Sequence, residues 1–226
     1  MNIFFWIIYY IKCGINIILA RICSYFKKIK KEESYANYDV KKLDDYLYLV
    51  KLEGSYYQMG KQYGLLMKKV LQNDVNGILN FIKDNERGIL RKLNPIIKNK
   101  MKSDDIFEAC YLMYLNTLDF IPQEIHDYYK GVAETSEIEL KKIIISNFFF
   151  ELTENHCIMY SNKTKEGLLS IRTLDLGCPL FSQSLIVFNP INKNKYLLLG
   201  HSFVLGGATM FSEKYLMLGE SFYDYN

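Results

Sequence analysis

The segment Cys157-Ile-Met-Tyr-Ser-Asn-Lys-Thr-Lys-Glu-Gly-Leu-Leu-Ser-Ile-Arg-Thr-Leu-Asp175 joins two runs rich in strand-forming residues through a polar turn that ends in glycine. This pattern predicts a β-hairpin with a five-residue turn. Centring the turn on Lys165 pairs Cys157 with about Thr173, within a residue or two. The hairpin would then bring Arg172 and Asp175 beside the thiol of Cys157.

These three side chains are chemically suited to a nucleophile. A guanidinium beside a thiol favours the thiolate and lowers the cysteine pKa, and a carboxylate can orient a neighbouring amine. The same residues also fit a structural interpretation, in which Cys157 is a buried core residue and Arg172 and Asp175 form an ion pair at the strand end. The residues by themselves leave both interpretations open.

Working outward from the hairpin, the chain changes character near Thr153. Before it, residues 46–53 favour a strand, and helical spacing of apolar residues then predicts helices over 59–83, 86–101, 104–118 with Ser103 as N-cap, 122–133 and 136–150 with Ser136 as N-cap. After it, short runs of strand formers lie at 157–162, 168–174, 183–188, 195–201 and 215–222. A strand, then helices, then antiparallel strands predict an α+β fold.

The N-terminus differs in composition from the rest. Residues 3–26 are largely apolar and are interrupted by Lys12 and Arg21, which predicts a transmembrane anchor and hence membrane association. A hydrophobic helix that caps the domain or binds a partner is the alternative. Residues 27–45 are predicted to form a basic and polar linker. Their lysines favour a cytoplasmic location for residues 46–226. A lumenal or secreted location is the alternative.

Composition excludes several classes of protein. The chain has 226 residues, of which 50% are hydrophobic, so it is a folded protein rather than a disordered one. Its net charge is only +3, without a basic run interleaved with aromatics, so no nucleic-acid partner is expected. Five irregularly spaced cysteines predict no disulfide framework. The histidines His126, His156 and His201 lack metal-ligand spacing, so we expect neither metal nor cofactor.

Three segments together resemble the isopenicillin N acyltransferase-like branch of the N-terminal-nucleophile hydrolases, which are related to choloylglycine hydrolase and acid ceramidase. The segments are the hairpin from Cys157, the glycine-rich stretch Gly54–Gly64 and the stretch 128–147. The resemblance implies an αββα fold. Here residues 46–156 would be the first strand and the helical propeptide, and residues 157–226 would be the first antiparallel strands of the catalytic region, with its C-terminal part absent.

The resemblance also implies a mechanism. The chain would be a zymogen that cuts itself between His156 and Cys157, and the new α-amine of Cys157 would serve as the base. An α-amine titrates near pH 7.7–8.0, which suits it to accept the thiol proton and return it to a leaving amine. Arg172 would lie beside the nucleophile and the substrate, an amide-linked acyl compound, and Asp175 would hold the amine.

Four positions depart from the family pattern, one of which is His156, where relatives usually carry glycine or another small residue. Thr173, Ser212 and Ser221 stand where relatives usually carry asparagines, and at the two serine positions these contribute to the oxyanion hole and to substrate contacts. Two functional hypotheses therefore remain. One is a self-processing cysteine amidohydrolase or acyltransferase. The other is a catalytically silent or truncated membrane-associated relative that acts as a binding or partner subunit, with a separate C-terminal chain as a possible partner.

Overall fold

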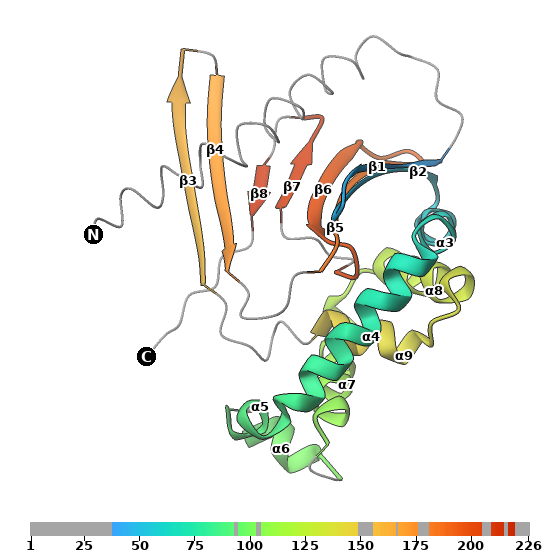
Figure 1. Cartoon of the computed structure of the whole chain (residues 1–226), viewed down its shortest axis with the longest axis vertical. Helices are drawn as coiled ribbons and strands as arrows, with labels where there is room; N and C mark the ends of the chain where they lie inside the picture. The colour runs from blue at the N-terminus through green and yellow to red at the C-terminus, as the bar shows by residue number, and fades with distance from the viewer. Residues whose placement is uncertain are drawn as a thin grey trace. The chain divides into compact units, whose positions relative to one another are not determined.

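The computed structural model describes residues 38–92, 95–102, 105–148, 156–165, 167–175, 181–204, 209–214 and 217–219, all within one compact unit. The helices in these ranges are α3 (Tyr56–Leu66), α4 (Lys68–Asp84), α5 (Glu86–Lys92), α6 (Pro95–Lys100), α7 (Ile106–Thr117), the 3-10 helix η2 (Leu118–Phe120), α8 (Gln123–Ser136) and α9 (Leu140–Phe148). The strands are β1 (Asp39–Asp44), β2 (Leu47–Gly54), β3 (His156–Thr164), β4 (Gly167–Asp175), β5 (Gln183–Pro190), β6 (Tyr196–His201), β7 (Thr209–Ser212) and β8 (Met217–Gly219). Figure 1 shows them, and they confirm an α+β chain.

The strands form two sheets in the described part of the chain. Six of them form a mixed sheet in the order β1-β2-β5-β6-β7-β8, and β3 and β4 form a separate hairpin. Strand β2 pairs in parallel with β5, although the whole helical half and the hairpin separate them in sequence. The remaining pairs are antiparallel. The parallel pair was not predicted, because no local pattern specifies which distant strand β2 will join.

A glycine and a capping serine turn β2 into α3. Gly54 has a φ of 121°, a backbone conformation that favours glycine. Ser55 then accepts a hydrogen bond from the Gln58 N–H at 3.3 Å, and the Gln58 side chain accepts one from the Ser55 N–H at 2.9 Å. This capping box starts the helix at Tyr56, three residues before the start that apolar spacing predicts. The predicted strand over 46–53 is confirmed.

Helices α3 and α8 are in backbone contact where they cross. A Cβ atom added to Gly60 would overlap the carbonyl oxygen of Tyr128, and one added to Gly131 would overlap that of Tyr57. Gly64, one turn beyond Gly60, meets α8 in the same way. Glycine is the residue that allows backbones to approach this closely. The glycines of the Gly54–Gly64 stretch therefore have a packing role in this fold.

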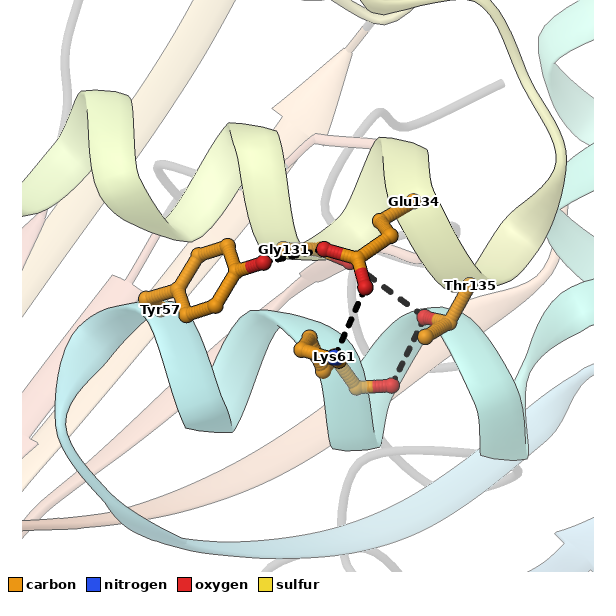
Figure 2. Close-up of polar contacts among 5 residues, drawn as sticks. All are labelled: Tyr57, Lys61, Gly131, Glu134 and Thr135. Carbon is orange, nitrogen blue, oxygen red and sulfur yellow. Dashed lines mark hydrogen bonds and ion pairs between the residues drawn. The ribbon is translucent and has the colours of Figure 1, made fainter.

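Polar side chains also link α3 and α8 where the helices cross, as Figure 2 shows. Lys61 on α3 forms an ion pair with Glu134 on α8 at 2.7 Å, and Tyr57 donates a hydrogen bond to the same carboxylate. The hydroxyl of Thr135 donates to the carbonyl oxygen of Lys61 at 2.7 Å. Since Lys61 and Glu134 are exposed, this ion pair contributes little energy and mainly fixes the rotation of one helix against the other.

The helices cover one face of the six-stranded sheet, and the other face is apolar as well. Val50, Ile186 and Leu198 are paired across β2, β5 and β6, and all three belong to the core shared with α3 and α8. On the opposite face, Leu49 and Leu185 are paired and are only 6% and 5% exposed. Strands that are apolar on both faces are typical of sheets that are covered on both sides.

Two predictions about segment boundaries are wrong for reasons of tertiary pairing. Residues 39–44, predicted as part of a linker, form the edge strand β1, because Val40 pairs with Val50 of β2. The charged side chains that hid this strand in the sequence are typical of edge strands. Ser136, predicted as an N-cap, is instead the buried last residue of α8, and the helix ends where Glu137 adopts a φ of 59°.

Other boundaries shift by shorter distances. The helix expected over 59–83 breaks at Met67 into α3 and α4, and the one expected over 86–101 is divided into α5 and α6, the second of which begins at Pro95. Asp105 caps α7 by accepting from the Phe107 N–H at 3.1 Å, and the predicted cap Ser103 lies outside the described residues. Strand β7 was not predicted, because four residues carry too weak a pattern.

The predicted anchor over residues 3–26 and most of the predicted linker over 27–45 also lie outside the described residues. Among the helices that are described, none is both long enough and apolar enough to span a bilayer.

The α3–α8 contact predicts how the protein responds to a single methyl group. Gly131→Ala should lower the free energy of unfolding by about 1–3 kcal/mol, because the added Cβ overlaps the α3 backbone. The measurement is urea denaturation followed by circular dichroism. Gly88→Ala is the matched control, since nothing lies within 4 Å of its added Cβ in α5, and it should leave stability unchanged or raise it slightly. Equal stability of the two variants would contradict the close crossing.

Candidate functional site

The hairpin predicted from Cys157 to Asp175 is confirmed by β3 and β4, with a register one residue away from the predicted centre. Cys157 pairs with Leu174 rather than with Thr173, and His156 pairs with Asp175. The turn is tighter than the predicted five residues, because Thr164 already pairs with Gly167. Only two residues therefore separate the paired ends of the strands.

This register decides how the candidate residues share the hairpin. Arg172 pairs with Met159 and is two residues from Leu174, so it occupies a position on the same face as Cys157, diagonally across the ladder. Diagonal neighbours are roughly 7–8 Å apart, a distance that long side chains commonly bridge. Asp175 occupies the opposite face, directly across from His156. The register thus puts Arg172 on the same face as Cys157 and Asp175 on the opposite face, so of the two expected neighbours of the thiol only Arg172 shares the face of Cys157.

The structure describes one of the two serines predicted as oxyanion or substrate positions. Ser212 ends β7, where it pairs with Tyr196 in the six-stranded sheet. Its hydroxyl accepts a hydrogen bond from the Lys214 N–H at 3.3 Å, so it stabilises a local turn. Ser221 lies outside the described residues.

A second polar group, which the sequence did not point to, lies buried between α3 and the sheet. The hydroxyl of Tyr63 donates to the carbonyl oxygen of Ser202 at 2.7 Å and lies 3.1 Å from the Ser184 hydroxyl. The hydroxyls of Ser184 and Ser202 are 2.7 Å apart. All three residues are at most 1% exposed. Because they come from α3, β5 and the end of β6, no local spacing could have revealed them.

Two further titratable groups, the buried Asp74 and the partly buried His201, have shifted pKa values. Burial raises the pKa of Asp74 to about 6, and hydrogen bonds from Ser182, including its N–H at 3.2 Å, oppose the rise. Burial also lowers the pKa of His201 to about 4. The Nδ1 of His201 lies 2.6 Å from the Gln183 side-chain nitrogen. Both groups are therefore held closer to their neutral forms than they would be in water.

The described residues also include His126 on α8 and Cys110 on α7, and neither is placed for catalysis at the hairpin. His126 lies 2.9 Å from the Tyr114 hydroxyl through its Nδ1. Cys110 is buried without a disulfide partner, and burial raises its pKa to about 12, which disfavours a reactive thiolate. Within the described ranges, no group of three or more His, Cys, Asp or Glu side chains is placed to hold a metal ion.

The buried trio predicts unequal effects for two similar substitutions. Tyr63→Phe should lower the free energy of unfolding by about 1–3 kcal/mol, because it leaves the polar atoms of Ser184 and Ser202 with one partner fewer. Tyr128→Phe is the control: its ring is equally buried, yet its hydroxyl has no hydrogen-bond partner among the described residues, so its loss should be neutral or stabilising. Chemical denaturation of both variants measures the difference, and equal losses would count against the trio.

The raised pKa of Asp74 predicts a pH-dependent stability. Between an unfolded-state pKa of about 4 and the folded-state value of about 6, the folded protein binds more protons than the unfolded one, so this contribution to stability is lost as the pH rises through that window. Asp74→Asn should therefore gain stability relative to the parent from pH 4 to pH 7, by about 1–3 kcal/mol. Urea denaturation across this range provides the test. Asp84→Asn, at the exposed end of the same helix, is the matched control, and an equal gain in both variants would contradict the role of burial.

Comparison with known proteins gives a distant and partial match. The chain is 25% identical over 142 residues to protein dcd1A of Dictyostelium discoideum, and the match covers 59% of this chain and 32% of dcd1A. The chain thus spans about a third of the length of this relative. No protein-family model matches the chain.

Proposed function

We propose that this chain is a self-processing cysteine amidohydrolase or acyltransferase that acts on an amide-linked acyl substrate. Cys157 would become its N-terminal nucleophile after cleavage of the His156–Cys157 bond. One observation carries the proposal. The register of β3 and β4 supports it: Arg172 lies diagonally across from Cys157 on the same face, and Asp175 lies at the same end of the hairpin on the opposite face, directly across from His156.

In the proposed cleavage, the sulfur of Cys157 attacks the carbonyl carbon of His156 and displaces the peptide nitrogen, which leaves a thioester and a free α-amine. Water then hydrolyses the thioester to the carboxylate of His156 and regenerates the thiol. In each catalytic cycle the α-amine accepts the thiol proton and returns it to the leaving amine. The position of Asp175, across from His156, suits a carboxylate that holds this amine in place.

The rest of the fold supports the proposal at the level of architecture. An αββα arrangement needs a sheet with helices on one face and a second layer on the other. The six-stranded sheet has helices on the face of Val50 and Ile186, and carries the buried Leu49 and Leu185 on the other. The stretch that resembles the family motif needs its glycines because they allow α3 and α8 to approach closely. Membrane association through residues 3–26, with the catalytic region in the cytoplasm, completes the proposal.

One observation favours the second candidate, a catalytically silent relative that binds a partner. Ser212, at a position where relatives carry an asparagine of the catalytic site, is engaged in a local turn through the Lys214 N–H. This bond uses the hydroxyl as an acceptor and holds its oxygen at the local turn, and a serine side chain reaches less far toward an oxyanion than an asparagine side chain does.

Intact mass spectrometry tests the proposed function directly. After incubation at neutral pH, the parent should yield two fragments, residues 1–156 and 157–226, whereas Cys157→Ala should keep the mass of the whole chain, because it lacks the attacking thiol. Cys110→Ala controls for general effects of thiol loss and should be cleaved like the parent, since Cys110 is buried in α7. A second readout is the alkylation rate of the thiol of Cys157, which should rise with an apparent pKa near 7.7–8.0 once its amine is free.

An uncleaved parent whose circular dichroism matches that of Cys157→Ala would overturn self-processing and favour the silent relative. Cleavage that also occurs in Cys157→Ala would indicate a contaminating protease.

A further inference from the structure

Helix α7 and the turn after it carry apolar side chains on their outer as well as their inner side. The inner side is buried, with Ala109, Cys110 and Tyr114 in the core. On the outer side, Leu115 is 42% exposed and Leu118 is 37% exposed, and Phe120 in η2 is 84% exposed. A soluble helix normally places polar residues on the side that faces water, so an apolar outer side indicates a contact that the described residues do not supply.

Lysines flank this apolar surface on two sides. The ammonium of Lys100 in α6 donates to the side-chain oxygen of Asn116 at 2.6 Å, which places the basic end of α6 beside Leu115. The ammonium of Lys141 in α9 lies 5.0 Å from the ring centre of Tyr111, on α7. Lys98 and Lys102 are also exposed around the end of α6. Asp119 is the acidic side chain within the apolar stretch itself.

We propose that Leu115, Leu118 and Phe120, with Lys100 and Lys141 beside them, form a docking surface for an anionic lipid bilayer. Apolar side chains that enter the interface while neighbouring lysines contact acidic headgroups are the usual chemistry of peripheral membrane binding. Charge favours this occupant over a second copy of the chain. A two-fold contact through the same surface would bring the lysines of each copy toward those of the other.

This surface is made of residues other than 3–26, and the proposal requires neither the insertion of that segment nor the enzymatic function. The docking surface places folded residues at the headgroups even where the N-terminal segment does not enter the bilayer. The test must therefore report on position 120 itself rather than on total binding.

The chain has a single tryptophan, Trp6, which allows a local probe. The double variant Trp6→Phe, Phe120→Trp has its only tryptophan on the proposed surface, and its fluorescence is measured with vesicles of brominated phosphatidylcholine. Adding about 30% phosphatidylserine should cause quenching by about half, because brominated chains quench an indole that lies among them. The matched control is Trp6→Phe, Leu65→Trp, at a 57% exposed leucine of α3, which should not be quenched.

Three further outcomes decide the proposal. Adding Lys100→Gln and Lys141→Gln to the position-120 probe should abolish most of the quenching on anionic vesicles, since the headgroups lose their cationic partners. Equal quenching at positions 65 and 120, or none at either, would overturn it. A blue shift of the position-120 probe that grows with protein concentration in the absence of vesicles would identify a second copy as the occupant and would also overturn it.

Discussion

The backbone contact between α3 and α8 is the constraint on which the described fold depends. Gly60, Gly64 and Gly131 remove the side chains that would hold the two helices apart. Because the two backbones are in contact, the side chains of Tyr57 and Lys61 reach Glu134, and the Thr135 hydroxyl reaches the α3 backbone. Protein interiors are close-packed, so a larger separation between α3 and α8 would force the sheet beneath them to shift. The glycine spacing in α3 is therefore a requirement of packing, whatever the chemistry of the chain.

The position of α3 against the sheet also explains the buried hydrogen bonds among Tyr63, Ser184 and Ser202. Tyr63 follows Gly60 by three residues on the helix, and its hydroxyl reaches Ser184 and Ser202 at the start of β5 and just past the end of β6. Nearby, burial shifts the pKa of Asp74 upward and that of His201 downward. From pH 4 to pH 6 the contribution of Asp74 to stability falls while that of His201 rises, so the two partly cancel. Hydrogen bonds between distant segments therefore fix this region, while its two titratable groups together make the free energy of unfolding depend only modestly on pH.

The proposed chemistry depends on a much more local element. The register of one hairpin puts Arg172 on the same face as Cys157 and Asp175 on the opposite face across from His156, without help from distant segments. The helical half contributes a rigid cover for one face of the sheet and, on the outer side of α7, an apolar surface with flanking lysines. The proposed catalysis and the proposed membrane docking involve different parts of the chain and can be tested independently.

The sequence alone determined those features that depend on neighbouring residues. It predicted the α+β class, the strand before Gly54 and the hairpin at Cys157 to within one residue of register, because turn chemistry and hydrophobic period act over short distances. The tertiary structure decided the rest. It paired β2 in parallel with β5, made a strand of the charged residues 39–44, extended α8 through Ser136, and joined Tyr63, Ser184 and Ser202. The parallel pair and the buried hydrogen bonds depend on partners far away in the chain, and no local pattern encodes which partners those are.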